Sequence, residues 1–239
     1  MTPTLSLNGT AHIGATRIFG PLSMMAPAGA WTCLLGPSGV GKSTILRLFA
    51  GLDEGITFDG DYGASDGGPL MPRVAMMAQD DLLLPWLDVM GNVTLGARMR
   101  GERPDHTRAR DILARVGLAD HAAKPPSALS GGQRQRAALA RTLMEDRPIV
   151  LLDEPFSALD AQTRARMQRL AGEVLRERTV LHITHDAAEA ARLGDQILLM
   201  SRDRIDAIAP PEGTSPRAPD AEETLRFEAQ LMRRLMADA

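Results

Sequence analysis

The stretch GPSGVGKST, residues 36–44, decides the fold of this chain. It follows the apolar run WTCLL, which predicts a short buried strand, and it runs into KSTILRLFAGL, which predicts a helix that stops at Gly51. A glycine-rich loop between a strand and a helix turns backbone N–H groups and the positive end of the helix toward phosphate oxygens. Lys42 would neutralise the β- and γ-phosphates, and Ser43 can ligate Mg²⁺. The sequence therefore predicts a nucleoside triphosphate site in this loop. Its expected residues are Gly36, Pro37, Ser38, Gly39, Val40, Gly41, Lys42, Ser43 and Thr44.

A second apolar run, IVLL at 149–152, leads into a pair of carboxylates. Asp153 would end this strand, and the carboxyl ends of strands are where α/β sheets place their ligands. We expect Asp153 to hold Mg²⁺ through its water shell. Glu154 is the next residue and can reach a water aligned with the γ-phosphate, so we expect it to be the general base. An isolated Asp–Glu pair after a strand is usually a solvated helix start, and the phosphate loop is what favours the catalytic interpretation.

A histidine follows the third predicted strand, TVLHIT at 179–184. His185 would lie at the same sheet edge as Asp153, within reach of a γ-phosphate, and Asp186 after it is a good helix N-cap. We therefore interpret His185 as a second catalytic residue. His182, in the middle of the strand, is interpreted as a core residue.

Strands and helices alternate in most of the chain, which predicts an α/β fold with a mostly parallel sheet covered on both faces. We expect residues 1–80 to form the first part of the core, 81–130 an inserted helical subdomain, 131–208 the rest of the core, and 209–239 a Pro-rich linker and a C-terminal helix. The apolar side of that last helix should pack on the protein itself, in preference to a partner. Its expected members are Leu225, Leu231, Met232 and Leu235.

The composition is that of an ordinary globular protein: 239 residues, 44% apolar and 24% charged, with a net charge of −3. This charge gives no reason to expect nucleic acid as a partner. The single cysteine, Cys33, falls in the apolar strand and is predicted to be a buried structural thiol. The first residues carry neither a basic start nor an apolar run, and no stretch of about 18 apolar residues occurs. These features predict a soluble, cytoplasmic chain.

A second glycine-rich turn, ALSGGQRQR at 128–136, also opens a predicted helix and is therefore suited to an anion. The phosphate loop, Gln79, LSGGQRQR, IVLLDEP, SALD at 157–160 and ITHD at 183–186 follow one another in that order. Together they resemble the ATP-binding subunit of an ABC transporter, over about residues 5–201. The resemblance implies a P-loop NTPase of the ABC type, with an inserted helical subdomain, that hydrolyses ATP with Mg²⁺.

The resemblance also explains why one chain has two phosphate-binding turns. In that family two subunits pair head to tail, and the signature turn of each covers the ATP held by the other. Residues 157–160 are implied to cross the dimer interface, and Gln79 to link the metal and the attacking water to the helical subdomain. The implied metal ligands are Ser43, Gln79 and Asp153. The implied signature contacts to the partner's ATP are Ser130, Gly131, Gly132 and Gln133.

The stretch MAQDDLLLPWLDVMGNV, 77–93, resembles importers of nitrate, of sulfonates such as taurine, or of hydroxymethylpyrimidine. This implies an integral membrane permease and, indirectly, a substrate-binding protein as partners, with the chain on the inner face of the cell membrane. The apolar run 83–86 either seats a helix of the membrane subunit or packs inside the helical subdomain. The alternatives are an exporter ATPase, a soluble ABC ATPase that acts outside transport, and a regulatory module without turnover, which Glu154 and His185 argue against.

One position departs from the family. An aromatic ring usually stacks on adenine ahead of the phosphate loop, and by spacing this position falls on Ile13. An aliphatic side chain can cover a base but loses aromatic stacking, which contributes about 1–3 kcal/mol in other base-binding proteins. We therefore predict weaker adenine affinity and poorer discrimination against GTP.

Overall fold

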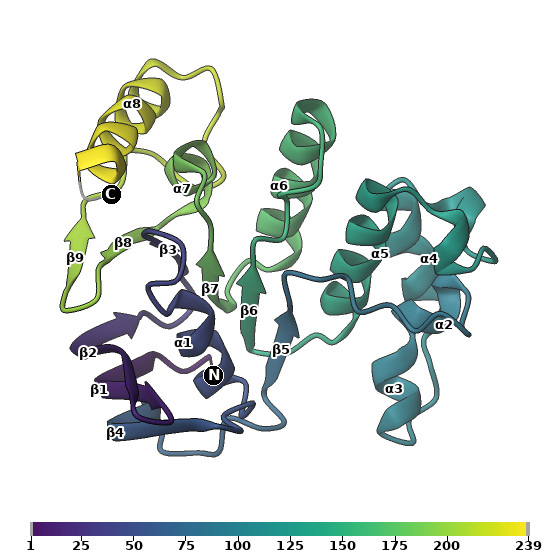
Figure 1. Cartoon of the computed structure of the whole chain (residues 1–239). Helices are drawn as coiled ribbons and strands as arrows, with labels where there is room; N and C mark the ends of the chain where they lie inside the picture. The colour runs from purple at the N-terminus through teal and green to yellow at the C-terminus, as the bar shows by residue number, and fades with distance from the viewer. Residues whose placement is uncertain (1, 238–239) are drawn as a thin grey trace. The chain divides into compact units, whose positions relative to one another are not determined.

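The computed structural model describes residues 2–237, which divide into two compact units. The first contains the residues up to 74, residues 147–153 and those from 176 onward; the second contains 75–146 and 154–175. Figure 1 labels the elements of both. The predicted helical subdomain, 81–130, falls inside the second unit, and this unit also includes the two long helices that follow it in sequence.

The first unit is built on a mostly parallel sheet, as the sequence predicts. Its strands run in the order β6-β7-β3-β8-β9, with β9 antiparallel to β8. Every residue of β3, β6 and β7 is buried, which explains their continuous apolar sequences. The start of β5 (Val74–Met77) lies beside this sheet, since the N–H of Ile149 donates to the carbonyl of Arg73. The bounds are β3 Trp31–Leu35, β6 Ile149–Asp153, β7 Thr179–Ile183, β8 Gln196–Met200 and β9 Ile205–Ile208.

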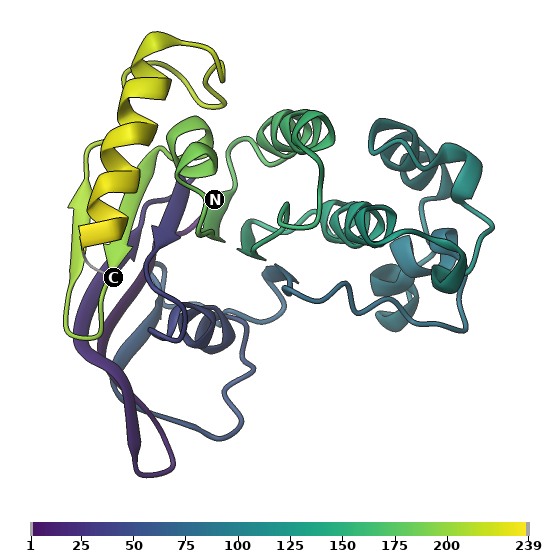
Figure 2. The same ribbon diagram turned by 45° about the horizontal axis from the view of Figure 1, so that its top comes forward.

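A second, antiparallel sheet of the first unit has the order β2-β1-β4. β1 (Leu5–Ile13) and β2 (Thr16–Ala26) form the long hairpin seen in purple in Figure 2. β4 (Ile56–Ala64) pairs with β1 and is an edge strand of this sheet. Helix α1 (Lys42–Phe49) contacts β4 as well as β6 and β7 of the parallel sheet.

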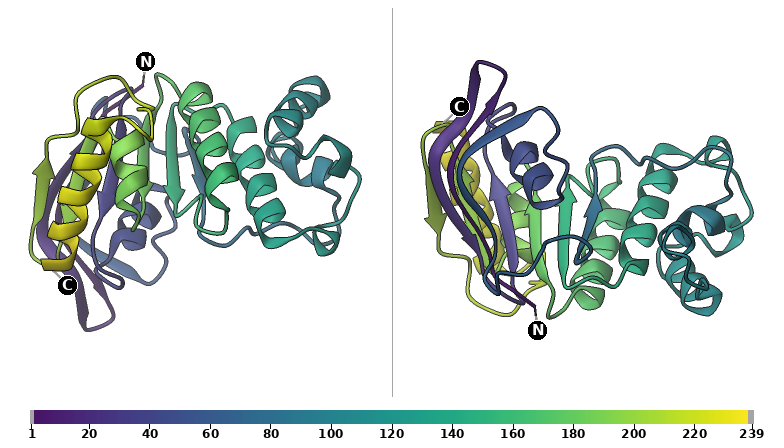
Figure 3. Two further views of the ribbon diagram at one scale, coloured as in Figure 1. Left: turned by 90° about the horizontal axis from the view of Figure 1, so that it is seen from above. Right: turned by 90° about the horizontal axis from the view of Figure 1, so that it is seen from below.

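The C-terminal helix α8 (Glu222–Ala237) packs beside α7 (Ala187–Leu193), as Figure 3 shows. The preceding linker is fixed by Arg217, whose Nη1 donates to the carbonyls of Ala191 and Gly194 at the end of α7. The predicted buried face of α8 is wrong in part. Leu231 is 1% exposed, but Leu225 and Met232 are 50% and 40% exposed, because the buried side of the helix runs instead through Thr224 and Leu231. The last residues, 238–239, lie outside the described part.

The second unit is helical around α5 (Gly131–Met144), which contacts α2, α3, α4 and α6. The fully buried Asn92 shapes the loop ahead of α2: its amide accepts from the N–H of Leu84 and donates to the carbonyls of Leu84, Leu87 and Asp88. Two short helices, α2 and α3, meet at Thr94, whose hydroxyl donates to the carbonyl of Met90. The bounds are α2 Val89–Val93, α3 Leu95–Met99, α4 His106–Arg115 and α6 Ala161–Val174.

Candidate nucleotide site

The register of the parallel sheet brings three predicted site segments of the first unit to one edge. Ile183 of β7 lies directly between Leu34 of β3 and Asp153 of β6. Neighbouring strands are about 4.8 Å apart, so Asp153 and the base of the phosphate loop are roughly 10 Å apart along this edge. His185 follows Ile183 by two residues on the central strand of the three. Loop, carboxylate and histidine therefore surround the space where parallel sheets bind ligands.

Glycine is required at two positions of the phosphate loop. Gly41, the N-cap of α1, has φ +106°, and a Cβ there would lie 2.6 Å from the ring of Phe19. Gly36 has φ +151°, and its Cβ would lie 2.3 Å from the carbonyl oxygen of Met200. Side chains rarely adopt these conformations, and neither site has space for one. The two glycines thus let the backbone wrap tightly ahead of α1, whose first N–H groups point into the loop.

Lys42 is held in the loop that it is predicted to serve. Its ammonium donates to the carbonyls of Gly36 at 2.7 Å and Pro37 at 2.8 Å, and the residue is only 8% exposed. Ser43 beside it is exposed, and Asp153 is 6% exposed. A serine hydroxyl and a carboxylate are hard oxygen donors of the kind that Mg²⁺ prefers. The residues present therefore fit a magnesium ion that takes its remaining ligands from phosphate and water.

No group of three or more His, Cys, Asp or Glu side chains placed to hold a metal occurs among residues 2–237.

His185 is exposed at the apex of a short turn between β7 and α7. The N–H of Asp186 donates to the hydroxyl of Thr184 at 3.0 Å and so closes the turn around His185. The Asp186 carboxylate then caps α7 by accepting from the N–H of Ala188 at 2.8 Å, as the sequence predicts.

In the second unit, the signature turn forms a complete capping box at the start of α5. The Ser130 hydroxyl accepts from the N–H of Gln133 at 3.2 Å, and the Gln133 side-chain oxygen accepts from the N–H of Ser130 at 2.8 Å. Ser130 and Gly131 are exposed, so the first N–H groups of this 14-residue helix face outward. The helix end is built to receive an anion.

His121 fixes the other end of the Gln133 amide. Since the amide oxygen faces Ser130, the NH₂ group faces His121 and donates to its Nε2 at 3.0 Å. Nε2 must therefore be unprotonated, and the ring proton lies on Nδ1. Nδ1 is buried and has no hydrogen-bond partner among residues 2–237. The imidazole thus holds the signature glutamine in the orientation that the capping box needs.

Glu154 adopts a left-handed backbone, with φ +48°, which is uncommon for a non-glycine residue. Its carbonyl accepts from the N–H and hydroxyl of Ser157 and from the side-chain amide of Gln135. The Gln135 oxygen in turn accepts from the N–H of Ala158 at 2.9 Å. Gln135 is 6% exposed on α5, so the signature helix directly holds the loop 154–158.

The segment after Gln79 is tied to the same helix. Gln79 is itself exposed, and Asp81 pairs with Arg134 of α5 at 2.9 Å. Arg141 lies about two turns further along the same face of α5. It donates to the main-chain oxygens of Asp81 and Leu82. Burial lowers the pKa of Arg141 below its usual value. Helix α5 therefore carries the signature turn at its N-terminus and supports two other predicted site segments along its length.

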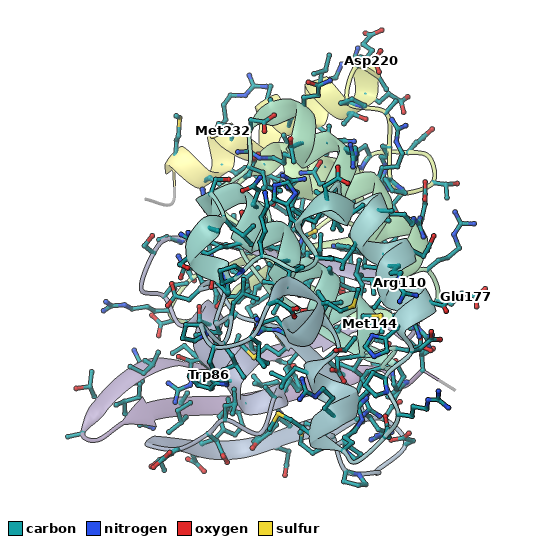
Figure 4. The ribbon with its side chains drawn as sticks, turned by 90° about the vertical axis from the view of Figure 1, so that its right-hand side faces the viewer. Trp86, Arg110, Met144, Glu177, Asp220 and Met232 are labelled. Carbon is teal, nitrogen blue, oxygen red and sulfur yellow. The ribbon has the colours of Figure 1, made fainter. Side chains whose placement is uncertain are left out.

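The predicted adenine contact is exposed, and the predicted membrane-subunit contact is exposed in part. Ile13, 45% exposed, ends β1 at the tip of the hairpin in the first unit. In the apolar run 83–86 of the second unit, Leu83 is buried at 8% exposure, whereas Trp86, labelled in Figure 4, is 75% exposed. The run therefore divides between packing inside its unit and a free surface.

The sequence interpretation missed Gln135 and His121 as site residues. Gln135 lies in the quoted signature stretch, but its contacts are 19 to 23 residues away along the chain. His121 is 12 residues from Gln133, and nothing in its local sequence marks it. Both act on site residues through side-chain geometry that only the folded chain shows.

A glycine-rich loop between β3 and α1, with an acidic residue at the end of β6, the next strand but one in the same parallel sheet, defines a P-loop nucleotide-binding protein. The family model described as ABC transporter matches residues 19–157. The chain belongs to this family and is an ATP-binding ATPase of the ABC type.

Three curated relatives show the extent of the similarity. An uncharacterized ABC transporter ATP-binding protein of Haemophilus influenzae is 41% identical over 91% of this chain and 92% of its own. The aliphatic sulfonates import ATP-binding protein SsuB 2 of Pseudomonas aeruginosa is 40% identical over 98% of this chain and 85% of its own. The protein of that name from Agrobacterium fabrum is 48% identical over 80% of this chain and 73% of its own.

Among solved structures, the ATP-binding cassette MJ0796 has a similar fold. Its dimeric post-hydrolysis state, bound to ADP and Pi, has a TM-score of 0.75 and 26% sequence identity, and covers 90% of this chain and 99% of that one. A second dimeric structure of this bacterial ABC transporter cassette has a TM-score of 0.74. Both support the ABC fold predicted from the sequence. Within residues 2–237, none of the helices combines the length and the apolar character needed to cross a membrane.

Proposed function

We propose that this chain is the ATP-hydrolysing subunit of an importer for aliphatic sulfonates. The observation that carries the proposal is the set of relatives with that name, which are 39–48% identical, in several cases over 98% of this chain. The sequence alone left nitrate and hydroxymethylpyrimidine as equal candidates, and the relatives favour sulfonates among the three.

In the proposed reaction, the residues of the phosphate loop bind the triphosphate. Backbone N–H groups of 36–44 and the Lys42 ammonium would neutralise its oxygens, and His185 would contact the γ-phosphate. Ser43, Asp153 and Gln79 would hold Mg²⁺, which neutralises the charge that develops on the phosphates. Glu154 would take the proton from the attacking water. The left-handed backbone of Glu154 raises the free energy of the folded state, and such strained residues are often found at catalytic positions.

We further propose that the active unit is a head-to-tail dimer of this chain. The signature turn supports this. The capped helix start at Ser130 and Gly131 is exposed and suited to bind an anion, and the chain already has a phosphate loop for its own nucleotide. The solved relatives named above are dimers. ATP would then lie between the phosphate loop of one subunit and the signature turn of the other, so that the γ-phosphate controls dimerisation.

The coupling to transport requires separate membrane subunits and, indirectly, a substrate-binding protein. Trp86 and Leu82 lie a few residues after Gln79 in the second unit and are apolar side chains with 75% and 60% exposure, which suits contact with a membrane partner. In this proposal the chain works at the inner face of the cell membrane.

A growth experiment tests the substrate. The gene is deleted in its own host, and the host is supplied with ethanesulfonate, taurine or sulfate as the sole sulfur source. We expect growth to fail on the sulfonates only, and to return with the wild-type chain but not with Glu154→Gln. Glu173→Gln is the matched control, because Glu173 is an exposed carboxylate on α6. Unchanged growth on sulfonates, together with loss of nitrate use or of thiamine-free growth, would assign the chain to one of the other substrates.

A further inference from the structure

A buried cluster of polar side chains lies between β3, β7 and α7 in the first unit. It contains Trp31, His182, Thr184 and Glu189, which are 5%, 0%, 2% and 3% exposed. Cys33 lies against it, with Sγ 3.9 Å from the His182 ring. Buried polar groups, and above all a carboxylate, are costly unless other groups satisfy them. The way in which these residues satisfy one another indicates what they do.

Trp31 determines which ring nitrogen of neutral His182 carries the proton. The indole Nε1–H donates to His182 Nδ1 at 3.3 Å, and the two rings meet edge to face at an angle of 84°. Because Nδ1 accepts this bond, the neutral imidazole carries its proton on Nε2. Nε2 lies 3.4 Å from Oε2 of Glu189. The edge of the ring therefore lies against the buried carboxylate, in a contact that lacks hydrogen-bond geometry.

The same oxygen of Glu189 holds the turn that carries His185. The Thr184 hydroxyl donates to Oε2 at 2.8 Å. Its own oxygen accepts from the N–H of Asp186 at 3.0 Å, across His185. Thr184 is further held to β3, since its N–H donates to the carbonyl of Leu34 at 3.3 Å. A continuous set of contacts thus leads from the indole in the core to the two residues that flank the exposed histidine.

We propose that His182, Glu189 and Thr184 are positioning residues for ATP hydrolysis, which act by fixing the turn that presents His185. This inference rests on the proposed role of His185. The physical reason is that an exposed side chain on a short turn contributes to a transition state only when the turn is held in place. A misplacement of about 1 Å can cost roughly 100-fold in rate. The interpretation of His182 as a core residue is correct for its burial but incomplete, because an apolar residue would fill the core without a polar contact to Glu189.

The test uses Thr184→Val, which keeps the shape and removes the hydroxyl. Thr179→Val is the matched control, since Thr179 is fully buried at the start of β7, the strand that Thr184 follows, and its hydroxyl likewise donates one bond, to the carbonyl of Pro3, and accepts one, from the N–H of Gly29. ATPase kcat and KM, the affinity for MgADP and the melting temperature are measured for both variants, for the rescue variant Thr184→Ser, and for His185→Ala alone and combined with Thr184→Val.

We expect Thr184→Val to lower kcat by roughly 10- to 100-fold with little change in MgADP affinity. Thr184→Ser should restore turnover, and Thr179→Val should lose a similar amount of thermal stability with kcat within about twofold of wild type. In the His185→Ala background, Thr184→Val should cost nothing more, because both changes remove one effect. His182→Gln, which keeps an acceptor for Trp31 and a polar group beside Glu189, should retain more activity than His182→Leu.

Any of three results would overturn the inference while leaving the role of His185 intact. The first is a kcat of Thr184→Val close to wild type when His185→Ala is impaired. The second is a further loss from Thr184→Val in the His185→Ala background, and the third is an equal loss in Thr179→Val. If His185→Ala itself hydrolyses ATP at the wild-type rate, the proposed function of that residue is wrong, and the inference falls with it. A poorly folded Thr184→Val is recognised by loss of MgADP affinity, and the His182 pair then decides.

Discussion

The side-chain amide of Gln135, on the signature helix, donates to the carbonyl oxygen of Glu154 at 3.1 Å. The same amide contacts the Ser157 hydroxyl at 3.3 Å and accepts from the N–H of Ala158. A single buried side chain therefore links the helix that would cover the partner's ATP to the backbone of the proposed general base. These bonds tie the position of Glu154 to that of α5.

Replacing Gln135 with Met should lower kcat for ATP by about 10-fold or more, because a displaced general base loses much of its 10²–10⁴-fold contribution. The unpaired backbone groups should also destabilise the fold by about 1–3 kcal/mol. Gln168→Met is the matched control, a buried glutamine on α6 of the same unit. Steady-state phosphate release and urea denaturation measure both effects. Equal losses of turnover in the two variants would mean that Gln135 matters for stability alone.

Changing Glu154 to Gln should keep ATP binding and trap an ATP-bound dimer. The amide cannot take the proton from water, so hydrolysis should fall by roughly 10²–10⁴-fold while the contacts to the triphosphate remain. Gel filtration with Mg-free ATP and phosphate release are the measurements, with Glu173→Gln on α6 as the control. A Glu154→Gln protein that stays monomeric and hydrolyses ATP at the parent rate would remove the base from the mechanism.

Replacing His121 with Leu should weaken the signature turn. Without the acceptor at Nε2, the Gln133 amide is free to rotate, and the loss of a helix cap costs about 0.5–2 kcal/mol. We expect normal ATP affinity of the monomer but a weaker ATP-dependent dimer, since the turn would serve only the partner's nucleotide. His106→Leu, an exposed histidine at the start of α4, is the control. Sedimentation with ATP in the Glu154→Gln background measures dimerisation, and an unchanged dimer constant would contradict the assignment.

The sequence predicted the phosphate loop, Asp153 and most strand and helix positions because these depend on local patterns. β6 ends at Asp153, and α7 begins directly after its N-cap Asp186, as predicted. β1, β2 and β9 were not predicted, since β1 and β2 combine irregular polar sequence with a bulge and β9 is a short edge strand. The face of α8 was partly wrong because Leu225 and Met232 lie about 100° around the helix from Thr224 and Leu231. The sequence did not predict the roles of Gln135, His121 and Glu189, because their hydrogen-bond partners are brought to them only by the fold.

Cys33 should react with thiol reagents only when the first unit opens. Burial raises the pKa of its thiol well above its usual value, and the negative charge of Glu189 adds to this shift. Because the folded state favours the protonated thiol, Cys33 contributes to the free energy of unfolding. The contribution is complete below the pKa of the thiol in the unfolded chain, 9.0, and is lost as the pH rises through the folded-state pKa. Labelling with a coloured disulfide reagent at pH 8 should be slow in buffer and fast in urea. Rapid labelling of the native protein would contradict the burial of this thiol.

Replacing Ile13 with Tyr should strengthen ATP binding, because a ring at this position of the hairpin tip can stack on adenine. The expected gain is about 1–3 kcal/mol, and the preference for ATP over GTP should rise with it. Met25→Tyr is the control, since Met25 is 55% exposed on β2 of the same sheet but far from the hairpin tip in sequence. Titration with a fluorescent ATP analogue, displaced by ATP or GTP, measures both quantities in the Glu154→Gln background. If Ile13→Tyr binds no better than Met25→Tyr, the base lies elsewhere, and the missing aromatic ring does not weaken this site.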